Sequence, residues 1–198
     1  GHLEAIVDET PASGTSVWTA NNTLDSNGWT GISIRQIILG SDISAGGDKI
    51  RITLQGNSTG IGQYDNVSIV ERVGTSSGTT IPTEILFGGA SGIAVPSSNS
   101  TVVSDWFDYT IDASKSYLIC MDVISDASKD DFVINVNTGA GYYWSLNTNS
   151  FNTTSLAGSI TFVPNRTHTI SKIETSVDQV LNTDIIAKMS RNGGTDYS

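Results

Sequence analysis

The chain has 198 residues and a formal net charge of −10, set by 20 acidic and 10 basic residues. No two basic residues are adjacent, so the sequence lacks the clustered Lys and Arg that bind phosphate backbones or anionic membranes. No apolar run reaches the roughly 18 residues of a membrane-spanning helix. We therefore expect neither nucleic-acid binding nor membrane insertion.

Charged residues make up only 15% of the chain, and Ser, Thr, Asn and Gly are abundant. This composition favours strands and turns over helices and is common in extracellular and virion-surface proteins. Residues 1–27 are polar, and we expect a leading segment with one strand near 16–19. Gly1 and His2 resemble the scar of a removed tag, so we expect the chain to be part of a longer protein.

From residue 28 onward, short apolar-polar alternations predict half-buried strands. In residues 49–54 the alternation places Ile50, Ile52 and Leu54 inward. Residues 116–124 are almost continuously apolar, which predicts a central strand buried on both faces. About nine such runs occur without an amphipathic helix, at 31–37, 49–54, 64–72, 83–87, 93–96, 101–109, 116–124, 132–137 and 167–175.

This pattern predicts an all-β fold, an antiparallel β-sandwich of the jelly-roll type over residues 28–175. Residues 176–198 indicate a short C-terminal β extension, the start of a further β segment that is truncated.

A set of short motifs in residues 28–124 resembles the β-sandwich accessory domain of secreted SGNH/GDSL-type esterases. The motifs include Leu86-Phe87-Gly88-Gly89, Ile93-Ala94-Val95-Pro96 and Ser104-Asp105-Trp106-Phe107, in that order. The resemblance implies the fold alone. The esterase's Gly-Asp-Ser block and its Asp-x-x-His pair are missing from this chain, so no catalytic residue carries over and we expect no enzyme activity.

The C-terminal residues 181–195 resemble a strand-turn segment of bacteriophage tail and virion proteins. This second resemblance implies that the sandwich is a module of a larger phage or bacterial surface protein, extracellular or on a virion.

Sugar-binding sites use flat aromatic rings with nearby amides. The run Tyr142-Tyr143-Trp144 is the strongest candidate, because successive side chains of a strand alternate and all three rings cannot point inward. The alternative is structural, with Tyr143 outward while Tyr142 and Trp144 cap the fold. The full predicted ligand set is Tyr142, Tyr143, Trp144, Asn147, Asn149 and Tyr64.

Two further tryptophans, Trp29 and Trp106, flank strong strand patterns, and we expect them to pack in the core. The single cysteine, Cys120, lies in an apolar run and is expected to be a small core residue.

An acidic turn near residue 126 offers oxygen ligands for a structural Ca²⁺ ion. The predicted ligands are Asp126, Asp130 and Asp131, although an ordinary solvated turn explains the same residues. A second option combines Asp25, Asp42 and Asp48.

These observations favour a non-catalytic, carbohydrate-binding module whose partner is a glycan or cell-surface polysaccharide. Two alternatives stay open. One is a purely structural virion or fibre module with no ligand. The other is the accessory domain of a secreted esterase whose catalytic domain is absent. With each of them, an oligomer could form through the missing flanking regions.

Overall fold

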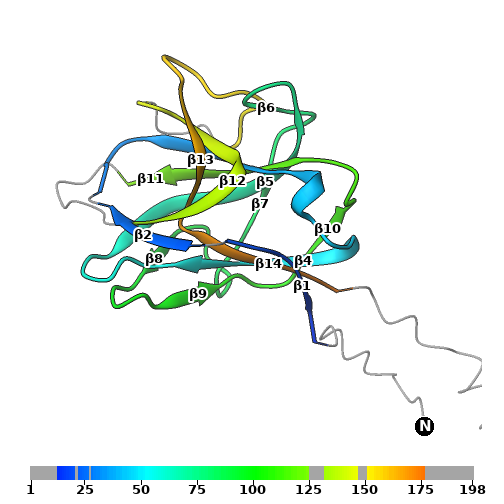
Figure 1. Ribbon diagram of the computed structural model, residues 1–198, viewed down its shortest axis with the longest axis horizontal. Coiled ribbons are helices and arrows are strands. Elements are labelled where there is room, and N and C mark those ends of the chain that lie inside the picture. The colour runs from blue at the N-terminus through cyan, green and yellow to red at the C-terminus, as the bar shows by residue number, and fades with distance from the viewer. Residues whose placement is uncertain (1–12, 21, 27, 125–131, 147–150, 177–198) are drawn as a thin grey trace, which may run out of the picture.

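The computed structural model describes residues 13–20, 22–26, 28–124, 132–146 and 151–176. These residues form antiparallel β-sheets, and their one helical element is a single 3-10 turn, η1 (Gly40–Asp42). The all-β expectation is confirmed (Figure 1).

The first sheet is built from both ends of the described chain and from its middle. Its strand order is β1-β14-β4-β10, with β9 pairing a further part of β4. The strands are β1 (Thr15–Thr19), β14 (Ile170–Ser176), β4 (Gly47–Gln55), β10 (Phe107–Ile111) and β9 (Thr101–Val103).

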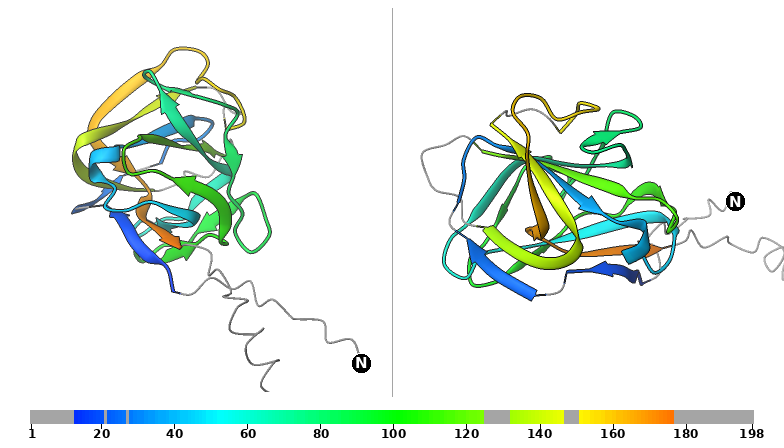
Figure 2. Two further views of the ribbon diagram at one scale, coloured as in Figure 1. Left: turned by 90° about the vertical axis from the view of Figure 1, so that its right-hand side faces the viewer. Right: turned by 45° about the horizontal axis from the view of Figure 1, so that its top comes forward.

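The second sheet has the order β13-β12-β3-β11-β5-β6, and three short strands join it at β12 or β5. Its long strands are β13 (Thr161–His168), β12 (Phe132–Ser145), β3 (Ser33–Ile38), β11 (Tyr117–Val123) and β5 (Gly62–Val73). Its short strands are β2 (Asn22–Ser26), β6 (Ser77–Gly78), β7 (Thr83–Glu84) and β8 (Ile93–Val95). The pairing of β12 with β13 shifts between Val136 and Gly141, and β12 bends strongly, as Figure 2 shows.

The two sheets share one hydrophobic core, which gives a sandwich-like arrangement. Ile50, Ile52 and Leu54 on β4 are each 0% exposed, as the alternation predicted. Strand β11 lies between β3 and β5, and every one of its residues is buried, which confirms the predicted central strand. Its Cys120 is 1% exposed, as expected.

The leading segment contributes to both sheets. The strand expected near 16–19 is β1, which pairs with β14 and buries Trp18 to 3% exposure. Strand β2 pairs with β12 in the other sheet. The sheets therefore include residues that precede position 28.

The last expected strand, 167–175, is in fact the junction of two strands. Thr169 separates β13 from β14 and has a φ of 59°, which is uncommon for a β-branched residue. Its hydroxyl lies 2.6 Å from the Tyr64 hydroxyl, and its carbonyl accepts a hydrogen bond from the Gln55 amide. The kink at Thr169 moves the chain from the second sheet to the first.

The described chain enters and leaves the fold at the same end, because Thr15 pairs with Thr175 (Figure 1). His168 and Thr169, which directly precede β14, lie at the opposite end of that strand. We call the end near Thr15 and Thr175 the attachment end and the opposite end the distal end.

Candidate functional site

The aromatic run on β12 is divided between the two faces of its sheet. Tyr142 and Trp144 face the core side, where Tyr142 is 8% exposed and Trp144 is partly buried. Tyr143 faces the outer side and packs against Phe162, with 4.7 Å between ring centroids. One ligand therefore cannot contact Tyr143 together with Trp144, and the predicted cluster separates into two surfaces.

Trp29 completes the core-side group, although it was expected in the core. Its side chain is 46% exposed, and its ring centroid lies 4.7 Å from that of Trp144 at an interplanar angle of 56°. Trp29 sits in the connection between β2 and β3, in the run Gly28-Trp29-Thr30-Gly31. Two sequence signals distinguish Trp29 from a core tryptophan: glycines flank it, and the residues around it do not alternate between apolar and polar.

This pair of indoles forms part of the lining of an apolar pocket of about 90 Å³. Aliphatic walls and aromatic rings form its lining almost completely. The lining residues are Trp29, Ile32, Ile34, Ile134, Tyr142, Trp144, Val163 and His168. We call the pocket and its two indoles the distal aromatic site, because His168 places it at the distal end.

His168 supplies an uncharged ring to this pocket. It is 0% exposed, and burial lowers its pKa to about 3, so the imidazole is neutral at physiological pH. Its Nε2 lies 3.1 Å from the hydroxyl of Tyr64, and its ring meets Tyr142 edge-on at 5.9 Å. The distal aromatic site therefore lacks an ionised group among its lining residues.

Hydrogen-bonding capacity remains among the residues that line the pocket. Within the part of the chain that the structure describes, the indole N–H groups of Trp29 and Trp144 and the Tyr142 hydroxyl form no hydrogen bond. Burial raises the pKa of Tyr142 although the Arg166 charge opposes the shift, so the hydroxyl keeps its proton. The site offers flat rings and a few uncommitted polar groups, the combination that orients small ligands.

Tyr64 does not line a groove, contrary to expectation. It is 1% exposed and belongs to the core, where its hydroxyl bonds to His168 and Thr169. Its place is below the distal aromatic site, as a support for His168. Asn147 and Asn149, the predicted amide partners, lie outside the described residues.

The main predicted Ca²⁺ ligands, Asp126, Asp130 and Asp131, also lie outside the described residues. The second option does not form. Asp25 accepts hydrogen bonds from Ser58, and Asp42 accepts one from the Ser41 hydroxyl. Among the described residues, no three His, Cys, Asp or Glu side chains come together in a metal-binding group.

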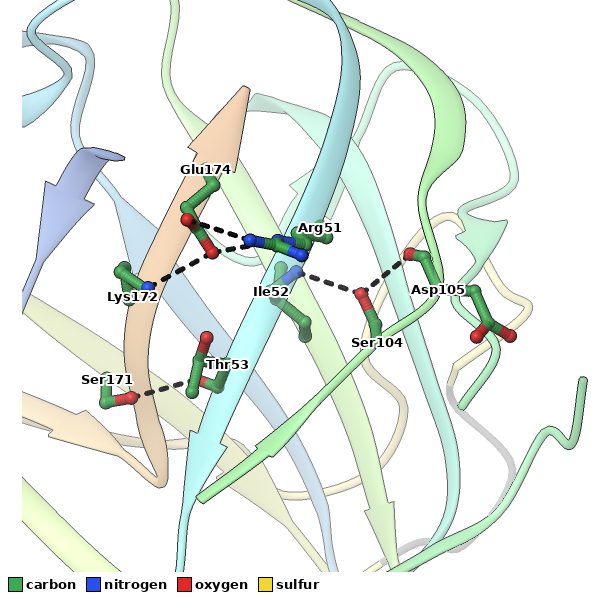
Figure 3. A network of polar contacts seen from close by, with 8 residues as sticks. All are labelled: Arg51, Ile52, Thr53, Ser104, Asp105, Ser171, Lys172 and Glu174. Atoms are coloured by element: carbon green, nitrogen blue, oxygen red, sulfur yellow. Dashed lines mark hydrogen bonds and ion pairs between the residues drawn. The ribbon is translucent and has the colours of Figure 1, made fainter. Parts of the chain in front are cut away.

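A second polar cluster lies on the outer face of the first sheet (Figure 3). Arg51 donates two hydrogen bonds to Glu174, at 2.9 and 3.1 Å, and stacks over the Trp106 ring. Lys172 lies 3.1 Å from the same carboxylate. Burial alone would raise the pKa of Glu174, but hydrogen bonds from the two cations lower it below its usual range. Each charged group of this cluster has a partner within it, so it is a structural network.

Trp106, expected in the core, is partly buried beneath Arg51 on this face. A Cβ on Gly14 would clash with the Trp106 ring, so the glycine lets this ring pack closely against the backbone. Contact with Gly14 and Arg51 explains why Trp106 is covered although it is outside the core.

Two of the motifs that carry the resemblance to the esterase accessory domain meet in space. Gly88 and Gly89 have φ values of 59° and 80° in a tight turn between Phe87 and Ala90. Both glycine amides donate to the Asp105 carboxylate, at 3.1 and 2.7 Å. The motifs thus form one structural turn, because the left-handed backbone needs glycine and the two amides need an acceptor.

No protein-family model matches the chain, and no curated protein is similar enough to count as a relative. In the described part of the chain, no helix has the length and apolar character needed to cross a bilayer.

Proposed function

We propose that the protein is a non-catalytic carbohydrate-binding module and that the distal aromatic site receives the sugar. The observation that supports this most directly is the exposed Trp29 beside Trp144, over an apolar pocket. Such rings stack on the C–H faces of pyranoses, while indole and phenol groups bond the hydroxyls. The net charge of −10 favours neutral over anionic glycans.

The proposed fold is a jelly-roll β-sandwich. A jelly roll is a long antiparallel hairpin of eight strands rolled up on itself, so its first strand pairs with its last and the pairs nest inward. The pairs β1–β14, β3–β11, β4–β10 and β5–β8 nest in this way along the chain. The order supports a jelly roll in which the hairpin of β12 and β13 is an addition.

The environments of His168 and Cys120 support the non-catalytic part of the proposal. His168 has its pKa lowered to about 3 by burial, which makes it a poor general base near neutral pH. Burial raises the pKa of Cys120 to about 11 although Arg35 opposes the shift, which disfavours the reactive thiolate. General-base catalysis and nucleophilic attack by a thiolate both require accessible groups, whereas the His168 and Cys120 side chains are 0% and 1% exposed.

The attachment end supports display of the site on a larger surface protein, which we propose to be extracellular and of phage or bacterial origin. Segments that join the module at Thr15 and at Ser176 meet it at one end. A module attached at one end projects from its parent and presents the distal aromatic site outward. An in-line fibre spacer would need attachments at opposite ends, so this geometry favours a binding role over a spacing role.

The experiment is a screen of plant, algal and bacterial glycans, followed by calorimetric titration of the best ligand against Trp29→Ala. We expect the substitution to weaken binding by about tenfold or more, as for a central aromatic contact. Phe162→Ala is the matched control, because Phe162 is 47% exposed and lies on the other face of the sheet. Its affinity should stay within about twofold of the unmodified protein.

Two outcomes would overturn the proposal. Absence of binding across the whole screen would remove the carbohydrate function and favour the purely structural module. Binding that survives Trp29→Ala but is lost in Phe162→Ala would move the site to the surface formed by Tyr143 and Phe162.

A further inference from the structure

The pocket under the two indoles is too small for a sugar ring. An apolar cavity of roughly 150 Å³ holds a benzene molecule, so a pocket of about 90 Å³ holds roughly three to four heavy atoms on that scale. Complete ligand sites usually occupy about 300–1,000 Å³. The pocket therefore suits one substituent of a sugar, while the ring itself stays outside against Trp29.

The lining determines which kind of substituent fits. Ile32, Ile34, Ile134 and Val163 offer only hydrocarbon surface. A hydroxyl or an ionised group that entered would lose its water and find the Tyr142 hydroxyl as its main partner, so it would regain only part of its hydrogen bonding, which costs about 1–3 kcal/mol or more. A methyl group loses nothing by leaving water and gains burial.

The Tyr142 hydroxyl adds a polar group to this apolar lining. The Tyr142 hydroxyl has no hydrogen-bond partner in the described part of the chain, and it keeps its proton. His168 is neutral, and its Nε2 already lies at hydrogen-bond distance from Tyr64. A substituent that combines a methyl group with one hydrogen-bond acceptor matches this lining better than a purely aliphatic or a purely polar one.

We propose that the pocket binds the acetyl group of an acetylated sugar. The inference rests on the proposed function and specifies its ligand class. The methyl contacts the aliphatic walls, the carbonyl oxygen accepts a hydrogen bond from the Tyr142 hydroxyl, and the sugar ring stacks on Trp29. N-acetyl and O-acetyl sugars share this chemistry.

The experiment compares neutral ligand pairs that differ only in the acetyl group. For the N-acetyl arm, oligomers of N-acetylglucosamine are titrated against glucose oligomers of the same length and linkage. For the O-acetyl arm, one neutral polysaccharide is titrated before and after mild alkaline deacetylation. We expect the acetylated member of at least one pair to bind about tenfold more tightly, since a site discriminates strongly when a group fills its pocket.

A pocket-filling variant tests where the acetyl group lies. Val163→Phe places a ring into the pocket and should abolish the preference for the acetylated ligand while the stacking on Trp29 remains. Val103→Phe is the matched control, because Val103 is 43% exposed on β9 and lies outside the pocket. If Val163→Phe does not fold, N-acetyl and N-benzoyl oligomers are compared on the unmodified protein, where the larger group should bind at least about tenfold more weakly.

Equal affinity for both members of both pairs, with binding that still depends on Trp29, would overturn the acetyl inference and leave the proposed function intact. A preference for acetyl groups that survives Val163→Phe, or that extends to the benzoyl group, would also overturn it. Failure of every glycan to bind would instead overturn the proposed function on which the inference rests.

Discussion

A buried neutral imidazole makes the stability of this protein sensitive to mild acid. His168 has a pKa of about 3 in the fold, because burial disfavours the charged ring, whereas an unfolded histidine titrates near 6.5. Below pH 6.5 the unfolded chain binds a proton that the folded chain refuses. The His168 contribution is therefore fully favourable above pH 6.5 and is lost as the pH falls toward about 3.

We predict that the free energy of unfolding falls by about 2 kcal/mol between pH 7 and pH 5 because of this one group. Urea denaturation at the two pH values measures the change. In His168→Gln the same drop should be largely absent, since most carboxylates are still ionised at pH 5. An equal pH dependence in both proteins would show that His168 is protonated inside the fold.

At the scale of single elements, the pattern of apolar residues was sufficient to predict strands that are buried on one face or on both. Residues 49–54 lie in β4 and residues 116–124 include β11. Their apolar patterns match strands that are buried on one face and on both faces, respectively. The division of 167–175 at Thr169 depends on contacts with Tyr64 and Gln55, which are distant in sequence. No local pattern carries that information.

The candidate site shows the same limit. Alternation correctly implied that Tyr142, Tyr143 and Trp144 divide between two faces of a strand. The partnership of Trp144 with Trp29 joins residues 115 positions apart and depends on the pairing of β12 with β3. Sequence reasoning therefore found one side of the distal aromatic site and misplaced the other in the core.

One buried arginine helps to hold the segment 151–156 over the outer face of the second sheet, together with the Gly78 amide, which donates to the Thr154 carbonyl. Arg35 is 0% exposed and donates hydrogen bonds to the carbonyl oxygens of Ser76, Thr153 and Thr154. The Ser68 hydroxyl donates to the carbonyl of Phe151 nearby. A cation on the outer face of a strand is buried here because this segment folds back over it.

We predict that Arg35→Met lowers the free energy of unfolding by about 2–4 kcal/mol, because the buried Ser76 carbonyl and the partly buried Thr153 carbonyl lose the donor that Arg35 supplies. Hydrogen exchange should also become faster in residues 151–156, since these contacts hold the segment down. Arg72→Met is the control, because its Nε donates to the exposed Thr75 carbonyl, and it should change stability by less than about 1 kcal/mol. Equal effects of the two substitutions would argue against the role of Arg35.

For the molecule as a whole, the pairing of Thr15 with Thr175 brings the two ends of the fold into one ladder. Domains whose ends lie close together tolerate insertion into loops of other proteins, because tethering both ends imposes little strain. The distal aromatic site would still face outward in such an insertion, since it lies at the opposite end of β14.

We therefore predict that residues 13–176, inserted through short Gly/Ser linkers into a surface loop of a stable carrier protein, fold as they do in the free chain. The thermal midpoint should fall by no more than about 5 °C, and the best glycan should bind with unchanged affinity, since neither tether approaches the site. As a control, a circular permutant that joins the original ends and opens the chain between Gly88 and Gly89 should be less stable, because the cut removes a turn held by Asp105. Loss of folding in the insertion, with the permutant unaffected, would show that the two ends are not paired, and one-ended display of the site would no longer follow from the fold.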